Sequence, residues 1–91
     1  MADFIKPLIV PTVNLNGSDP GNLIGDLMNC KVQIDAALEK MQVATPHGRD
    51  YLDGEQLQAA RRAWFERTHA LSKLASEITD LAIEIQKQKE G

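Results

Sequence analysis

Apolar side chains recur every three or four residues along two segments of this 91-residue chain. Such spacing places them on one face of a helix, so it predicts a first helix over residues 19–45 and a second over residues 55–89. Asp19 before Pro20 is typical of a helix start, and Thr45 before Pro46 marks the end of the first helix. The two apolar stripes are Leu23, Leu27, Cys30, Ile34, Ala37, Met41 and Ala44, then Leu57, Ala60, Trp64, Leu71, Leu74, Ile78, Leu81 and Ile85.

The remaining segments are an arm and a loop. Residues 1–18 are rich in apolar side chains but contain Pro7 and Pro11, which fix φ and each remove a backbone donor. We therefore expect an extended arm that turns at Asn14 to Gly17, because Asn-Gly favours a turn. With residues 46–54 as the interhelical loop, the predicted fold class is all-α. It is a single domain over residues 1–91 that forms an antiparallel helical hairpin with an extended N-terminal arm.

The predicted helices differ in length, which leaves apolar surface to cover. At about 1.5 Å per residue the second helix is longer by roughly two turns, so we expect Asp80 to Lys89 to extend past the first helix. The arm or a second subunit would cover this stretch. A short hairpin with apolar flanks favours a homo-oligomeric helical bundle, and a monomer completed by the arm is the alternative. The flanking residues are Val32, Leu38, Val43, Ala75 and Ala82.

Composition argues against several classes of function. A net charge of −3 disfavours general binding to nucleic acids, whose partners usually carry a basic excess. Prolines interrupt the apolar start of the chain, so we expect neither a signal peptide nor a membrane span. The single Cys30 fits a reducing compartment such as the cytoplasm, and on the apolar stripe its thiol should stay protonated and inert. Phosphate-binding loops and zinc-binding motifs are absent from the sequence, so we predict no enzymatic activity, no cofactor and no metal site.

Basic and aromatic side chains gather between residues 47 and 69, which include all four arginines and both histidines of the chain. Guanidinium groups hold phosphates in two-point contacts, and aromatic faces stack on planar groups. This combination predicts a pocket for a small anionic ligand, in which arginines hold phosphates, Tyr51 or Phe65 stacks on a base and His47 adds a hydrogen bond. The predicted ligand-binding residues are His47, Arg49, Tyr51, Arg61, Arg62, Phe65 and His69.

Simpler interpretations exist for the same residues. Arg49 and Asp50 could pair with each other at a polar turn, with Tyr51 packed over the end of the hairpin. Phe65 beside Trp64 is also typical of the aromatic anchors of a protein interface.

Arg67 falls on the apolar stripe of the second helix. A guanidinium buried there requires an anionic partner. We expect that partner to be Asp26, Asp35 or Glu39 across the seam, or a phosphate of the ligand.

Two short motifs resemble those of a known family. The chain carries Asn14-Leu15-Asn16-Gly17 before the first helix and Gly48-Arg49-Asp50-Tyr51 between the helices. With the two helices, these motifs resemble a family of short accessory proteins encoded by tailed phages and prophages. The resemblance implies the cytoplasm of a host cell as the setting, where small acidic helical proteins often counter host defences.

The leading hypothesis is a non-enzymatic, homo-oligomeric protein that sequesters a small anionic nucleotide signal. In the phage setting such a protein would remove a cyclic or ADP-ribose-type messenger. The second hypothesis is a protein-interaction module that inhibits a host defence protein by direct contact. A third is a structural or assembly role in the phage particle. Only the first requires a small molecule that raises the melting temperature of the protein.

Overall fold

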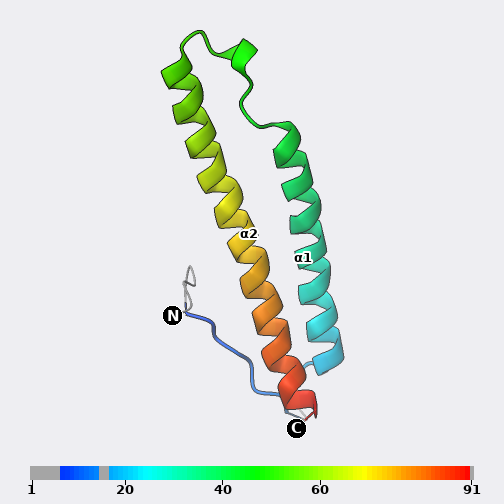
Figure 1. Ribbon diagram of the computed structural model, residues 1–91. Helices are drawn as coiled ribbons and strands as arrows, with labels where there is room; N and C mark the ends of the chain where they lie inside the picture. The colour runs from blue at the N-terminus through cyan, green and yellow to red at the C-terminus, as the bar shows by residue number, and fades with distance from the viewer. Residues whose placement is uncertain (1–6, 15–16, 91) are drawn as a thin grey trace.

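A computed structural model describes residues 7–14 and 17–90 and shows two long antiparallel helices (Figure 1). Helix α1 spans Pro20–Val43, a short 3-10 helix, η1, spans Gly48–Asp50, and α2 spans Gly54–Glu90. No strand occurs within the described ranges. The predicted all-α hairpin is confirmed, and each helix boundary lies within two residues of its predicted position.

Both helices begin where side-chain caps satisfy free backbone donors. The Asp19 carboxylate accepts a hydrogen bond from the backbone N–H of Asn22 at 3.1 Å, and Pro20 occupies the first turn. In the same way, the Asp53 carboxylate accepts from the backbone N–H of Glu55 at 2.8 Å. These contacts use the N–H groups that a helix start leaves without intrahelical partners, so they fix where each helix begins.

The register of the hairpin places the start of α1 level with the end of α2. Near the loop, the Trp64 indole Nε1 donates to the Met41 carbonyl at 2.9 Å. At the far end, a side chain added at Gly21 would come within 3.8 Å of Lys89 Nζ. The prediction that Asp80 to Lys89 extends past α1 is therefore wrong.

The extra length of α2 lies instead at its start, where α2 extends beyond the end of α1 (Figure 1). The connection between the helices, residues 44–53, continues past α1 and folds against this first part of α2. Arg61 Nε donates to the Pro46 carbonyl at 3.3 Å, and Gly48 lies close to the Leu57 side chain. With 24 residues in α1 and 37 in α2, the helices differ by about three and a half turns, more than the predicted two, and the connection takes up most of this difference at the loop end.

The most deeply buried apolar side chains all lie in the C-terminal half of α2. Among the described residues, only Ala75, Ala82 and Ile85 are buried hydrophobics, with 4%, 4% and 1% of their surface exposed. Ala75 and Ala82 were predicted on exposed flanks, and that prediction is wrong. Small side chains at these positions let neighbouring segments approach α2 closely, which buries them.

On α1 the large side chains of the predicted stripe are half-buried and its small ones are exposed. The half-buried ones are Leu23, Leu27, Ile34 and Met41, and the exposed ones are Cys30, Ala37 and Ala44. The buried face is wider than the stripe, since Ile24, Met28 and Leu38 are also half-buried. Larger side chains gain more from burial than small ones. The expectation that the Cys30 thiol lies on the apolar seam is therefore wrong. Val32 and Val43 are exposed, as predicted.

The described part of the arm, residues 7–14, lies along the C-terminal half of α2 and runs in the same direction (Figure 1). The Gln88 side chain makes two hydrogen bonds to it, accepting from the Val13 N–H at 2.9 Å and donating to the Pro11 carbonyl at 2.9 Å. Leu8 lines a hollow together with Leu74 and Leu81. The arm then turns, with the Gly17 N–H donating to the Asn14 carbonyl at 3.3 Å.

Residues 1–6 and 15–16 lie outside the described residues, and with them the first third of the predicted arm and the centre of the Asn-Leu-Asn-Gly motif. Neither helix, within the described ranges, is apolar enough over a sufficient length to cross a membrane.

Candidate functional site

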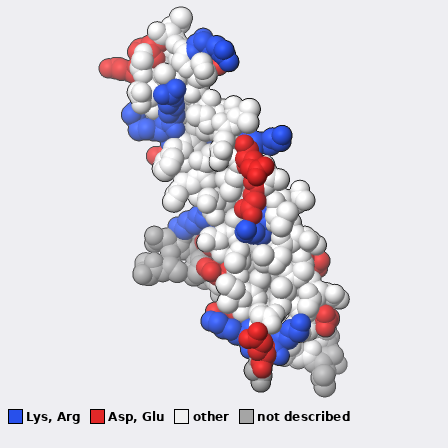
Figure 2. Space-filling view, turned by 45° about the vertical axis from the view of Figure 1, so that its right-hand side comes forward, with Lys and Arg blue, Asp and Glu red and all other residues white. Residues whose placement is uncertain are grey.

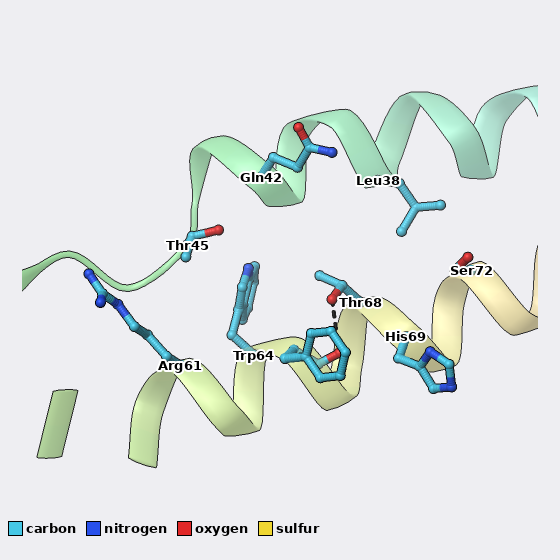
Figure 3. Close-up of a pocket in the computed structure, with 9 residues that line it drawn as sticks. Leu38, Gln42, Thr45, Arg61, Trp64, Thr68, His69 and Ser72 are labelled. Atoms are coloured by element: carbon cyan, nitrogen blue, oxygen red, sulfur yellow. Dashed lines mark hydrogen bonds between the residues drawn. The ribbon is translucent and has the colours of Figure 1, made fainter. Parts of the chain in front are cut away.

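A groove with a volume of about 560 Å³ lies between α1 and α2, close to the loop end of the hairpin (Figure 3). Residues at the end of α1 form one wall of the groove, and residues of α2 form the rest. On each helix, side chains three or four residues apart lie on the same face. The groove is lined by Leu38, Gln42 and Thr45, and on α2 by Arg61, Trp64, Phe65, Thr68, His69 and Ser72.

Trp64 forms the apolar base of the groove. Its ring rises from α2 towards α1 and is half-buried, and its only polar atom donates to the Met41 carbonyl at 2.9 Å (Figure 3). A buried indole is stable when its N–H finds such a partner. Leu38 points from α1 towards α2 and continues the apolar surface. The base of the groove is therefore held in place, and it offers hydrophobic contact to whatever binds there.

Phe65 and His69, one turn apart on α2, form a stacked pair beside this base. Their ring centroids are 6.0 Å apart and their planes differ by 11°. Phe65 is 68% exposed, so most of its ring is open to solvent. An exposed, oriented aromatic ring is suited to stacking on a planar ligand or to filling a pocket in a partner.

The polar groups of the groove are cationic or uncharged. Arg61 uses Nε to donate to the Pro46 carbonyl, so the guanidinium is positioned while its terminal nitrogens form no ion pair with a described residue. Thr68 donates its hydroxyl hydrogen to the Phe65 carbonyl at 2.9 Å, so its oxygen can act only as an acceptor for a ligand (Figure 3). Gln42 and Ser72 complete the polar lining.

The structure divides the seven predicted ligand-binding residues into two groups. Arg61, Phe65 and His69 line the groove, and Arg62 lies in an adjoining shallow hollow with Arg61, Phe65 and Glu66. The other group, in the loop, does not line the groove.

The loop residues have local roles. His47 Nδ1 accepts a hydrogen bond from the Arg49 backbone N–H at 3.3 Å and so caps η1. Tyr51 is half-buried directly after η1. Arg49 and Asp50 form no ion pair within 4.0 Å, so the predicted local pairing of these two residues does not occur.

Arg67 does not occupy the seam. It is exposed, and its Nη1 donates to the Ala63 carbonyl at 3.1 Å within the same helix. The prediction of a buried guanidinium with a carboxylate partner is therefore wrong. A straight α-helix has 3.6 residues per turn, so a strict heptad pattern drifts across its surface, and Thr68 is half-buried in place of Arg67.

The wall that faces α2 was not predicted from the sequence. Gln42 of α1 and Thr45, which follows the end of α1, reach the groove because of the register between the helices, which no short motif encodes. The Trp64 indole indicates where α1 lies, because a half-buried N–H donor needs an acceptor, here the Met41 carbonyl on the facing helix.

Charged side chains are mixed over the face that Figure 2 shows, with lysine and arginine interspersed among aspartate and glutamate. That face has no continuous basic surface of the kind that binds nucleic-acid backbones. Within the described part of the chain no three His, Cys, Asp or Glu side chains lie close enough together to hold a metal ion. The side chains that line the groove offer hydrogen bonds, an aromatic face and the positive charge of Arg61. No protein-family model, curated protein or solved structure matches this chain.

Proposed function

We propose that this protein is a non-enzymatic binder that sequesters a small anionic nucleotide in the groove between α1 and α2. The observation that carries the proposal is that Arg61, the Phe65–His69 stack and the Trp64 base share one groove. Its volume of about 560 Å³ falls within the range of roughly 300–1,000 Å³ typical of small-molecule sites. Such sites are mostly apolar with a few polar groups that orient the ligand, as this one is.

Each part of the ligand has a matching group. The terminal nitrogens of Arg61 donate to a phosphate, and Arg62 on the rim adds a second positive charge. The base stacks on the exposed ring of Phe65. Ser72 offers a donor or an acceptor, and Thr68 offers an acceptor only, which favours a ligand with an N–H or O–H group near it. His47, Arg49 and Tyr51 are left out of this site because they do not line the groove.

The two short motifs support a phage setting for this activity. There the nucleotide would be a messenger of a host defence system, and sequestration would lower its free concentration. No chemical step is needed for this function, since binding alone removes the signal. One bound nucleotide per groove would make the capacity proportional to the amount of protein.

A thermal-shift screen tests the proposal. The panel contains cyclic mononucleotides, cyclic dinucleotides and ADP-ribose derivatives, with the parent nucleosides as controls without phosphate. A ligand at 100 times its Kd stabilises the folded state by roughly 2.7 kcal/mol. Each kcal/mol raises the Tm of a domain of this size by roughly 4–8 °C. We expect at least one phosphate-bearing member to shift the Tm and its nucleoside to shift it little. If no nucleotide shifts the Tm, the proposal is wrong.

The exposure of Phe65 favours a second candidate, a module that binds a host protein by direct contact. Aromatic residues and arginines dominate the binding energy of protein interfaces, and Phe65 lines the groove together with Trp64 and Arg61. Replacement by another aromatic residue separates the candidates. A base stacks equally well on Tyr, so Phe65→Tyr should keep nucleotide affinity. A shaped pocket in a protein partner would discriminate between the two side chains.

A further inference from the structure

We infer that a second copy of this chain packs antiparallel over one flank of the hairpin and forms a four-helix dimer. This flank, the groove face, comprises the groove and the residues that continue its α2 side at helical spacing. The α2 residues of the groove face are Phe65, Thr68, Ser72, Ser76, Thr79 and Ile83. The inference depends on the surface of the chain and not on the proposed function.

The chain exposes more surface than a compact monomer of its mass would. The chain exposes 6983 Å², whereas a compact monomer of 10.1 kDa exposes about 5300 Å². The excess of about 1700 Å² is larger than the roughly 800 Å² that each partner buries in a standard interface. The radius of gyration is 18.0 Å, against about 12 Å for a compact chain of this length. A second copy supplies the core that one hairpin lacks.

The two flanks of α2 differ in how much of their apolar surface is exposed to solvent. On the opposite flank of α2, the arm already packs at Leu74, Ile78 and Leu81. At its far end the groove face meets the arm, because Leu8 and Val10 line a hollow with Ile83. Both large apolar residues of the face are nevertheless open to solvent. Phe65 is 68% exposed and Ile83 is 47% exposed. A second copy packed on this face would remove both side chains from water, which favours association.

The shape of the groove face allows a second helix to pack against it. Between Phe65 and Ile83 the groove face of α2 carries only small hydroxyl side chains at its centre, Ser72, Ser76 and Thr79. Small side chains let a second helix approach closely. A two-fold axis near Ser72 places the Phe65 ring of each copy over Ser76 and Thr79 of the other. The same surface patch then serves both subunits, as a two-fold interface requires.

The charges at the two ends of the groove face favour an antiparallel arrangement of the two copies. Arg61 and Arg62 lie at the loop end of this face, whereas Asp80 and Glu84 lie near its other end. Antiparallel packing brings each pair of arginines towards the carboxylates of the partner, whereas parallel packing would bring four arginines together. Glu84 already pairs with Lys87 at 3.1 Å, so Asp80 is the carboxylate with no ion pair among the described residues. Arg62 and Asp80 are thus the pair expected to meet.

The dimer would also change the groove. A single chain leaves its outer side open, and the Ser76 to Thr79 segment of the partner would cover it. Each dimer would then hold two enclosed grooves, each with walls from both copies.

The mass of the purified protein in solution, measured without nucleotide across micromolar concentrations by sedimentation equilibrium, tests the inference. We expect the parent to reach twice the 10.1 kDa of the chain. Phe65→Ala should raise the dissociation constant of the dimer by at least about tenfold, because it removes the aromatic contact that each copy makes with the other. Circular dichroism would confirm that each variant keeps its helices. A parent that stays at 10.1 kDa at every concentration overturns the inference.

A charge exchange tests the antiparallel arrangement. Arg62→Asp and Asp80→Arg should each weaken the dimer, and the double variant should restore it, because the two charges face each other in opposite copies. Arg67→Asp is the matched control, since Arg67 is an exposed arginine of the same helix outside the groove face and the exchange introduces the same charge change. Failure of the double variant to recover, or an equal loss in Arg67→Asp, contradicts this arrangement. A dimer that binds no nucleotide would leave this inference intact and refute the proposed function, and a monomer that binds one would do the reverse.

Discussion

At the scale of single residues, the fold is stabilised most clearly at positions where a polar side chain makes one defined hydrogen bond. Trp64 is the best example, because its indole N–H reaches the Met41 carbonyl across the seam at 2.9 Å. Asp19 has a similar role at the start of α1, where it accepts from the Asn22 N–H. The first hydrogen bond stabilises the seam between the helices, and the second stabilises the start of α1.

Trp64→Phe should lower the free energy of unfolding by about 0.5–1.5 kcal/mol, the net contribution of a typical hydrogen bond, because the ring stays but the donor is lost. Urea unfolding followed by circular dichroism measures the change. The control is Phe65→Tyr, which keeps an exposed aromatic ring in the next position. Equal stability of Trp64→Phe and the parent would show that the bond to Met41 does not support the seam.

Asp19→Ala should destabilise the protein by roughly 0.5–2 kcal/mol because it removes the helix cap. Asp19→Asn keeps a side-chain acceptor and should be nearly neutral. Asp26→Ala is the matched control, since Asp26 is exposed inside α1 and forms no ion pair among the described residues. Thermal unfolding separates these variants. If Asp26→Ala costs as much as Asp19→Ala, the cap has no special role.

At the scale of helices and segments, local sequence signals set where elements begin and end. Asp19 and Pro20 are local signals, and the helix start that they predict is confirmed. Asp53 has the same role at the start of α2, where it accepts from the Glu55 N–H. The register between the helices is different in kind. It depends on how the ten residues between Val43 and Gly54 fold, so the extra length of α2 was predicted at the wrong end of the hairpin.

The same limit applies to the groove. Arg61, Phe65 and His69 were predictable because helical spacing alone places them on one face, and the structure brings them together. Gln42 comes from the other helix and was not predictable. Arg67 was misplaced because small rotations of a helix decide whether a residue at the edge of a stripe is buried.

Contacts with the arm can be tested through Gln88. Gln88→Ala removes both hydrogen bonds to the arm, so the Val13 amide should lose protection from hydrogen exchange. Gln86→Ala is the matched control, because Gln86 bonds only to Glu90 within α2. Protection of Val13 that is equal in both variants would mean that Gln88 does not hold the arm.

Close approach to the C-terminal half of α2 can be tested at Ala82, which is 4% exposed. Ala82→Leu should cost about 1–3 kcal/mol of stability through overpacking. The exposed Ala70 of the same helix is the control, and Ala70→Leu should cost little. Denaturant unfolding measures both. If Ala82→Leu is tolerated as well as Ala70→Leu, the segments around Ala82 are not packed as described.

At the scale of the whole molecule, the chain is a rod with extents of 61 × 26 × 17 Å and very little interior. Its stability in isolation comes from one seam and one arm, so any partner that covers the groove face adds a large share. A second copy and a bound nucleotide would both act there. Binding and assembly should therefore influence each other, because both use Phe65 and the groove face.

The most direct test of the proposed function is calorimetric titration of the best nucleotide from the thermal screen into Arg61→Ala, Arg67→Ala and the parent. Arg61 lines the groove, whereas Arg67 is an exposed arginine six residues further along the same helix that donates to the Ala63 carbonyl. Loss of a charge-assisted hydrogen bond should weaken binding to Arg61→Ala by about 1.5–3 kcal/mol, and Arg67→Ala should bind as the parent does. Equal affinities of the parent and Arg61→Ala would contradict the assignment of the groove as the nucleotide site.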